Sequence, residues 1–177
     1  MPRLFLTVAL LPLAMAACAG SDAPRTQGPR AVAALVDAEG RSAGQAVVTQ
    51  AADGLWIEVS ATGIAPGPHG MHVHAVGSCT APDFTSAGPH WNPAGHEHGR
   101  KNPKGAHAGD APNLVANDAG AGTLRAWLGA GTLTSGPNAL LDADGASVVV
   151  HADPDDEMTD PSGKSGKRIL CGVLTAR

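Results

Sequence analysis

The chain has 177 residues, a formal net charge of −4 at pH 7, 23 glycines and 14 prolines. Because glycine and proline both destabilise helix interiors, this composition excludes a long-helix bundle or a coiled coil. A hydrophobic fraction of 43% excludes global disorder, and the slight acidic excess gives no reason to expect a nucleic-acid partner. The length fits one domain, and the unusual feature is the presence of eight histidines.

The first 17 residues have the features of a signal peptide. Arg3 precedes an apolar run from Leu4 to Met15, which is too short to span a bilayer comfortably, and small residues follow it. The alternative is a buried helix. We expect residues 1–17 to be a signal peptide, residues 18–30 a flexible tether, and residues 31–177 the folded domain.

A possible lipid anchor follows the signal peptide. Residues 15–18 (MAAC) resemble the cleavage box of bacterial lipoproteins, in which the cysteine becomes the lipidated first mature residue. This resemblance predicts a periplasmic protein whose only membrane attachment is a lipid on Cys18. Ala19 at the next position, rather than an aspartate, favours the outer membrane. The alternative is ordinary signal cleavage nearby, with Cys18 lost or left free.

The number of cysteines is odd, and lipidation of Cys18 would account for one of the three. Cys79 and Cys171 then remain for a disulfide, which the oxidising periplasm permits. The alternative is that both stay as unpaired thiols.

From residue 31 onward, short apolar or alternating runs are separated by turn signals. Leu55, Ile57 and Val59 would share one face of a strand, and Asp53-Gly54 and Asp144-Gly145 are hairpin-type turn dipeptides. No stretch keeps a 3.6-residue period. We therefore predict an all-β antiparallel sandwich or barrel of eight strands, over residues 31–36, 45–49, 55–59, 70–76, 113–116, 122–128, 146–151 and 168–175.

Two long segments do not fit strands. Residues 79–110 contain four of the histidines and four prolines, and residues 152–167 are rich in Asp, Gly, Ser and Pro. Loops of this length in a compact domain are usually functional or disordered. The density of metal-ligating side chains in residues 79–110 favours a function.

His72 and His74 are two positions apart, so on a strand both imidazoles point to the same face, opposite Met71 and Val73. Two nitrogen ligands on one rigid face are half of a copper or zinc site. The alternative is a pair of exposed histidines.

The remaining histidines extend this pattern into two ligand sets. Three imidazoles and one carboxylate are a closed tetrahedral set for a structural zinc, and four nitrogens suit Cu(II). His151 ends an apolar strand and could lie beside His72 and His74 across a sandwich. One histidine must then serve both sets. The candidate zinc set is His90, His98, His107 and Asp110, and the candidate copper set is His72, His74, His90 and His151.

Four motifs, in this order, resemble those of copper/zinc superoxide dismutases: residues 67–74 (GPHGMHVH), 88–93 (GPHWNP), 107–110 (HAGD) and 166–173 (GKRILCGV). The resemblance covers about residues 31–176. The fold that it implies is an eight-stranded Greek-key β-barrel with two long functional loops, in agreement with the strand count.

The resemblance also implies roles for individual residues. His72, His74 and His151 would bind copper, His90 would bridge copper to zinc, and His98, His107 and Asp110 would complete the zinc set. His96 could compete with His98 for zinc, but the spacing of His98 from His90 and His107 fits the family pattern.

Two further positions match residues of the family that are not metal ligands. Asp155 matches the carboxylate that links a copper histidine to a zinc histidine, here His72 and His98; its alternative is a solvated loop acid. Arg168 matches the arginine that receives the anionic substrate, and its alternative is a surface charge.

The activity implied is the disproportionation of superoxide to dioxygen and hydrogen peroxide, with a His-ligated copper alternating between Cu(II) and Cu(I). His90 and Arg168 would be the catalytic residues, and the cofactors would be copper and zinc. The alternatives are a non-catalytic periplasmic carrier of copper and zinc, and a structural β-sandwich with incidental histidines. The oligomeric state stays open, with a homodimer as one candidate.

Overall fold

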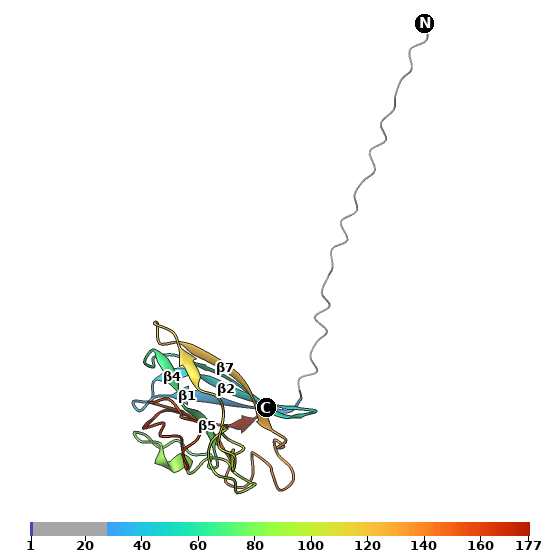
Figure 1. Ribbon diagram of the computed structural model, residues 1–177, viewed down its shortest axis with the longest axis vertical. Coiled ribbons are helices and arrows are strands. Elements are labelled where there is room, and N and C mark those ends of the chain that lie inside the picture. Colours follow the sequence, from blue (N-terminus) through green and yellow to red (C-terminus); the bar gives the residue numbers. More distant parts are fainter. Residues whose placement is uncertain (2–27) are drawn as a thin grey trace.

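The computed structural model describes Met1 and residues 28–177, which form an almost closed barrel of antiparallel strands (Figure 1). The predicted signal peptide and most of the predicted tether, including Cys18, lie outside the described residues. The described part contains one short 3₁₀ turn, η1 (Thr85–Ala87), and no α-helix. Its strands are β1 (Arg30–Val36), β2 (Ser42–Ala51), β3 (Gly54–Ala61), β4 (Gly67–His69), β5 (Met71–His74), β6 (Leu114–Ala116), β7 (Gly122–Gly129), β8 (Ser147–His151), β9 (Arg168–Val173) and β10 (Thr175–Ala176).

The strand order explains how the barrel closes. The neighbours run β4-β6-β7-β3-β2-β1-β9-β8-β5, and β10 pairs with β1. Because β4 and β5 are separated only by Gly70, the two ends of this order meet in one segment of chain. β3 pairs with β7 rather than with β4, which is the non-sequential pairing of a Greek key. The all-β Greek-key prediction is confirmed, with β4 and β5 together forming the fourth of the eight expected strands.

The fourth strand differs from its predicted range of 70–76. His69 pairs with Leu114 of β6, whereas Met71 pairs with Val150 of β8. At Gly70 the chain passes from one partner strand to the other, and its N–H donates instead to the main-chain oxygen of Asp153. The strand therefore begins earlier and breaks at Gly70, because it has two partners.

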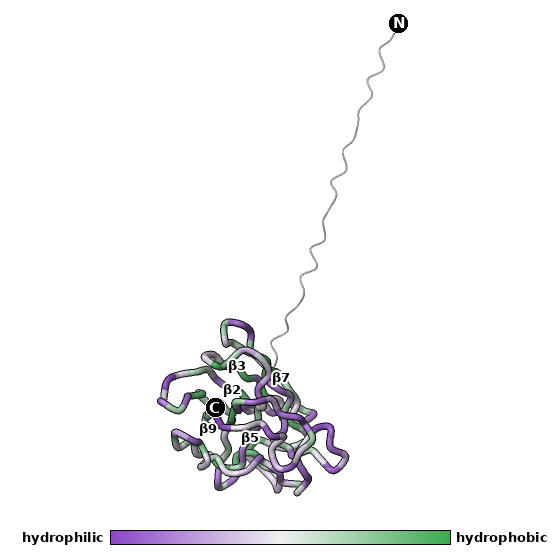
Figure 2. Tube along the Cα trace, turned by 60° about the vertical axis from the view of Figure 1, so that its left-hand side comes forward, coloured by the Kyte–Doolittle hydropathy of each residue, from purple (hydrophilic) through white to green (hydrophobic). Residues whose placement is uncertain are grey.

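The barrel interior is filled by the alternating apolar residues. Leu55, Ile57 and Val59 are all buried on one face of β3, as the alternation predicted. Burying a side chain of this size stabilises the fold by about 1.5–3 kcal/mol. Figure 2 shows the hydrophobic residues along the strands and the hydrophilic residues mainly in the connecting loops.

The two predicted hairpin turns have different outcomes. β2 and β3 do form a hairpin, but Ala51 pairs with Gly54, so the turn residues are Ala52-Asp53, one position earlier than the predicted dipeptide. Asp144-Gly145 turns the chain just before β8, but β8 pairs with β5 and β9 and not with the preceding β7. The second hairpin prediction is wrong, because a turn dipeptide reverses the chain locally while strand partners are selected by packing across the barrel.

A disulfide joins Cys79 to Cys171 across a sequence separation of 92 residues. This confirms the predicted pairing and excludes two unpaired thiols. Closing so long a loop lowers the entropy of the unfolded chain, worth roughly 4–5 kcal/mol in the chain-entropy treatment. The bridge lies against a small hydrophobic cluster, separate from the barrel core, that contains Phe84, Ala87 and Val149.

Both long loops lie on the β5 side of the barrel, away from β7. In Figure 1 they are the green segment that follows β5 and the red-brown segment that follows β8. In the described part of the chain, no helix has the length and apolar character needed to cross a membrane.

Candidate metal centre

The two histidines of β5 point away from the barrel core. Met71 and Val73 join the core cluster, whereas His72 and His74 face the opposite side, where other histidines approach them. Both imidazoles are 0% exposed. The predicted alternation is therefore confirmed, and the alternative of two exposed histidines is wrong.

Four histidines form a compact group whose ligand atoms all lie within 4.8 Å of one another. Each contributes one buried ring nitrogen that has no hydrogen-bond partner among the described residues. Leaving one such polar atom buried and unpaired costs about 1–3 kcal/mol. Four converging nitrogen lone pairs therefore fit a metal ion that prefers nitrogen ligands, such as copper. The four atoms are His72 Nδ1, His74 Nε2, His90 Nε2 and His151 Nε2.

Burial favours the neutral form of three of these rings, those of His74, His90 and His151. It lowers the pKa of His90 to about 4 and that of His151 to about 3, and it lowers the pKa of His74 well below its usual range. The hydrogen bond from His90 to Asp110 raises the pKa of His90, but burial lowers that pKa by more. Because a metal ligand must be deprotonated, these three imidazoles are ready to bind a cation at neutral pH.

A second group surrounds one carboxylate oxygen, Asp110 Oδ1. This oxygen atom lies 2.8 Å from His90 Nδ1, 3.0 Å from His98 Nδ1 and 3.3 Å from His107 Nδ1. The other oxygen, Asp110 Oδ2, accepts hydrogen bonds from the main-chain N–H groups of Gly99 and His107. Three imidazole nitrogens and one carboxylate oxygen, converging in this way, fit a tetrahedral zinc.

His72 also comes near this second group, since its ligand atom lies within 4.8 Å of those of His90, His98 and Asp110. Direct contacts favour His107 instead. His107 Nδ1 is 3.3 Å from His90 Nδ1, whereas Nε2 of His72 contacts Asp155 and its Nδ1 belongs to the first group.

The ring of His90 faces both groups, with Nε2 in the first and Nδ1 against Asp110 in the second. It stacks on His72, with ring centroids 4.0 Å apart and planes inclined by 27°. The sequence analysis predicts that one histidine serves both ligand sets, and in the structure the ring of His90 faces both groups.

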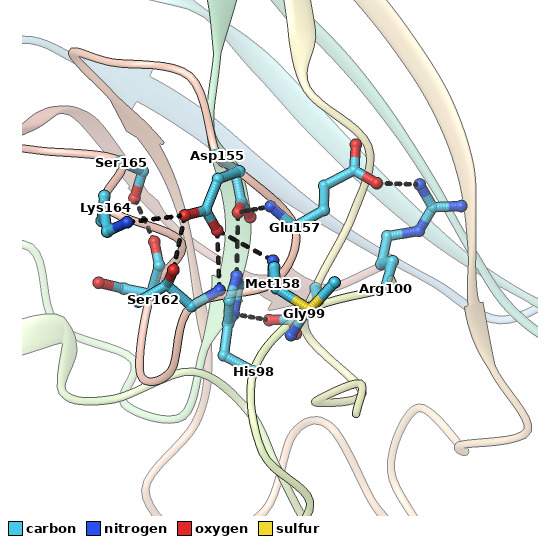
Figure 3. A network of polar contacts seen from close by, with 12 residues as sticks. His98, Gly99, Arg100, Asp155, Glu157, Met158, Ser162, Lys164 and Ser165 are labelled. Atoms are coloured by element: carbon cyan, nitrogen blue, oxygen red, sulfur yellow. Dashed lines mark hydrogen bonds and ion pairs between the residues drawn. The ribbon is translucent and has the colours of Figure 1, made fainter. Parts of the chain in front are cut away.

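Asp155 joins the two groups from behind. Its Oδ1 accepts a hydrogen bond of 3.0 Å from His98 Nε2 (Figure 3). Its Oδ2 accepts one of 2.7 Å from His72 Nε2. Burial alone would raise the pKa of Asp155, but these hydrogen bonds outweigh burial and hold that pKa well below its usual range. The alternative of a solvated loop acid is wrong.

The position of His98 between two carboxylates has an electrostatic consequence. Burial alone would lower the pKa of His98, but hydrogen bonds to Asp110 and Asp155 raise it to about 9. In the metal-free protein His98 therefore carries a proton at neutral pH, and a cation that binds its Nδ1 must displace that proton.

An open cleft of about 820 Å³ leads to this region, and its lining includes His90, His151 and Arg168. The Arg168 guanidinium donates hydrogen bonds of 2.8 and 2.9 Å to the main-chain oxygens of Phe84 and Gly88. An anion entering the cleft therefore meets a fixed cation beside two imidazole rings, and Arg168 is not a free surface charge.

His96 lies outside both groups. Its side chain is exposed, and its Nδ1 contacts the main-chain oxygen of Ala106 at 3.1 Å. His98, in contrast, is buried against Asp110. The geometry therefore favours His98 over His96 as the zinc-side histidine.

Several contributors to the site are not predicted from the sequence. Main-chain oxygens of Gly88 and Gly166 accept hydrogen bonds from His74 Nδ1 and His151 Nδ1, and main-chain atoms give no residue-specific signal. Gly163 has φ +64°, and a Cβ there would overlap Asp155 Oδ1. In the sequence it could be read only as a turn glycine. The loop between β7 and β8 was also not expected to line the cleft, to which it contributes Pro137, Ala139 and Asp142.

An antiparallel β-barrel that carries a nitrogen-only group beside a nitrogen–oxygen group has the ligand sets of a metal-binding protein with two adjacent sites. A family model described as copper/zinc superoxide dismutase (SODC) matches residues 42–174. The chain therefore belongs to the copper/zinc superoxide dismutase family. The predicted enzyme class, superoxide dismutase of the Cu/Zn type, and the predicted cofactors, copper and zinc, are confirmed at the level of this family.

Individual relatives agree with this assignment. A Cu-Zn superoxide dismutase of Caulobacter vibrioides is 42% identical over 147 residues, covering 81% of this chain and 84% of that protein. A Cu-Zn superoxide dismutase of Aquifex aeolicus is 39% identical over 151 residues, covering 84% of this chain and 88% of that protein. Among solved structures, a double mutant of a SOD-like protein from Bacillus subtilis superposes with a TM-score of 0.77 at 42% identity, covering 81% of this chain and 95% of that one. The structure of the Cu/Zn superoxide dismutase from Brucella abortus superposes with a TM-score of 0.64 at 28% identity, covering 82% of this chain and 99% of that one.

Proposed function

We propose that this protein converts two superoxide ions and two protons into dioxygen and hydrogen peroxide at the cleft beside His90, His151 and Arg168. The observation that carries the proposal is the position of His90. Its ring belongs to both ligand groups and also lines the open cleft next to a fixed cation.

The proposed ligand assignment follows the two groups. Four buried imidazole nitrogens without hydrogen-bond partners support copper binding in the first group, and the convergence of three Nδ1 atoms on Asp110 Oδ1 supports zinc binding in the second. Copper would be held by His72, His74, His90 and His151, and zinc by His90, His98, His107 and Asp110.

Once bound, copper supplies one-electron redox chemistry between Cu(II) and Cu(I), and zinc supplies a fixed positive charge. Arg168 attracts and orients each superoxide anion, because its charge is permanent and its guanidinium is fixed by two main-chain oxygens. After the first superoxide is oxidised, His90 would take up a proton from water at Nε2, when that nitrogen no longer binds copper, and would give this proton to the peroxide formed from the second superoxide. Water in the open cleft supplies the other proton.

The alternative function is a non-catalytic carrier of copper and zinc. A carrier needs the ligands, but it gains nothing from a fixed cation in the lining of an open cleft. Arg168 therefore favours the enzyme.

Metal analysis paired with a superoxide-decay assay tests the proposal. The enzyme is expected to hold one copper and one zinc per chain and to consume superoxide catalytically. A protein that binds both metals but leaves the decay rate of superoxide unchanged would be a carrier. A protein that retains neither metal after purification and reloading would be a structural barrel with incidental histidines.

We also propose that the protein is exported to the periplasm and anchored, at the outer membrane, by a lipid on Cys18. Residues 15–18 support this location, and so does the Cys79–Cys171 disulfide, a bond typical of oxidising compartments. Mass spectrometry of the mature N-terminus tests it. A lipid on Cys18 is expected, and an unmodified N-terminus would contradict the anchor. Light scattering on the same sample tests whether a homodimer forms.

A further inference from the structure

Each proposed ligand histidine other than His90 has one ring nitrogen that faces a metal group and one outer nitrogen that faces away. Outer-nitrogen partners matter because they determine which nitrogen carries the hydrogen and in which direction the ring points. In four of these histidines the outer nitrogen has a direct partner. His72 and His98 donate to Asp155, His74 donates to the main-chain oxygen of Gly88, and His151 to that of Gly166.

His107 is the exception. Its Nδ1 faces Asp110, but its outer Nε2 has no direct hydrogen bond in the described part of the chain. The carboxylate of Asp160 lies close by, with its Oδ1 3.8 Å from His107 Nε2. A shift of about 1 Å would bring this pair to hydrogen-bonding distance.

The same oxygen of Asp160 already contacts the zinc group. It accepts a hydrogen bond of 2.6 Å from the main-chain N–H of His98, while the main-chain oxygen of His98 accepts one of 2.9 Å from the Asn102 side chain. The Asp160 side chain is 50% exposed and lines the cleft together with His107. It can therefore move toward His107 without repacking the core.

Asp160 belongs to the loop of residues 152–167, which is attached to the loop of residues 79–110 in other ways. Figure 3 shows Glu157 of residues 152–167 facing Arg100 of residues 79–110. The charged atoms of this pair, Glu157 Oε2 and an Arg100 guanidinium nitrogen, are 3.7 Å apart. Such partly exposed ion pairs contribute only about 0–1 kcal/mol. The main-chain N–H of Lys101 also joins the two loops by donating a hydrogen bond of 2.9 Å to the main-chain oxygen of Glu157. The side chains of this loop that contact the zinc group itself are two carboxylates, Asp155 and Asp160.

We propose that Asp160 is a positioning residue for the zinc half of the site. One carboxylate oxygen holds the main chain of His98 and pairs with Nε2–H of His107, so that Nδ1 of His107 remains free to bind the metal. This inference rests on the proposed zinc assignment, and it adds a second outer carboxylate to the one supplied by Asp155.

The test measures zinc and copper affinity of the full-length protein by competition with chelators. Loss of an outer partner typically weakens metal binding by about 10–100-fold, and we expect a loss of zinc affinity in this range for Asp160→Ala, with copper affinity unchanged. Asp160→Asn retains an oxygen for the His98 N–H but loses the charge, so its loss should be smaller. The matched control is Asp142→Asn, because Asp142 lines the same cleft and its carboxylate accepts one hydrogen bond, from the main-chain N–H of Asp144.

A second readout separates positioning from general loop stability. In the zinc-loaded wild type, ring ¹⁵N chemical shifts of His107 should report a hydrogen on Nε2, and Asp160→Ala should change those shifts and leave those of His74 unaltered. Wild-type zinc affinity in Asp160→Ala, or equal losses of copper and zinc, would overturn the inference. If the wild type itself fails to bind zinc, the proposed function fails instead, so the two failures are distinguishable.

Discussion

Arg168 donates a hydrogen bond of 2.8 Å to the main-chain oxygen of Phe84, which is 84 positions earlier in the chain. The Phe84 ring is fully buried in the small cluster beside the Cys79–Cys171 disulfide. The position of the cation in the cleft therefore depends on a hydrophobic anchor that lies outside the metal groups. Phe84 therefore acts as this anchor through its side chain and holds Arg168 through its main-chain oxygen.

Phe84→Ala should consequently weaken both the fold and anion binding. Loss of a buried phenylalanine ring typically costs about 3–5 kcal/mol, which urea unfolding of the metal-loaded protein would measure. Without its anchor, the Phe84 oxygen no longer holds Arg168, so the affinity for a small anion such as azide should fall. Phe84→Leu keeps most of the buried volume and serves as the control. Unchanged azide affinity in a folded Phe84→Ala protein would contradict the anchoring role.

Arg168→Ala should reduce the rate without releasing either metal. Local positive charge at a cleft raises the association rate of an anion by about 10–1,000-fold, and this effect falls as salt is added. The variant should therefore be slower at low ionic strength and less sensitive to salt than the wild type, with unchanged copper and zinc content. Lys167→Ala removes a neighbouring exposed base and is the matched control. Equal effects of both variants would mean that general charge, not the position of Arg168, attracts the substrate.

The parts of the site that the sequence predicts are those with local periodicity. The alternation of residues 71–74 is sufficient to predict that His72 and His74 face away from Met71 and Val73, because strand geometry determines it. The number of ligands that each metal requires predicts that one histidine is shared between the two groups, and the family resemblance implies that this histidine is His90. The turn at Asp144-Gly145, in contrast, does not identify which strands pair.

The parts that the sequence does not predict depend on contacts between distant segments. The oxygen that holds Arg168 belongs to the main chain of Phe84, so its role is independent of the side-chain type. Asp160 contacts His98 across a sequence separation of 62. In the sequence it is one of several acids in a loop, and only the fold distinguishes it from Asp156, which bonds within its own turn.

Gly163→Ala should displace Asp155 from His98. A Cβ at this position would overlap Asp155 Oδ1 and approach His98 Nε2 to 2.8 Å. The matched control is Gly40→Ala. Gly40 also has a left-handed backbone, with φ +76° compared with +64° for Gly163, but an added Cβ at Gly40 has no atom within 4 Å. Both variants bear the cost of a left-handed backbone, about 1–2 kcal/mol. Only Gly163→Ala should weaken metal binding, by about 10–100-fold in chelator competition, and equal metal affinities in the two variants would contradict this.

Metal removal should loosen the loops more than the barrel. The interior of the barrel is apolar and keeps its packing, whereas residues 79–110 have little secondary structure and are held largely by contacts around Asp110 and Asp155. Without metals, four buried nitrogens also remain unpaired. Free metal at a thousand times its dissociation constant stabilises a folded protein by about 4 kcal/mol, so chelation should lower the unfolding temperature. Hydrogen exchange should then rise in residues 79–110 and 152–167 while β1, β2 and β3 stay protected. A uniform rise across the barrel would show instead that the metals stabilise the whole fold.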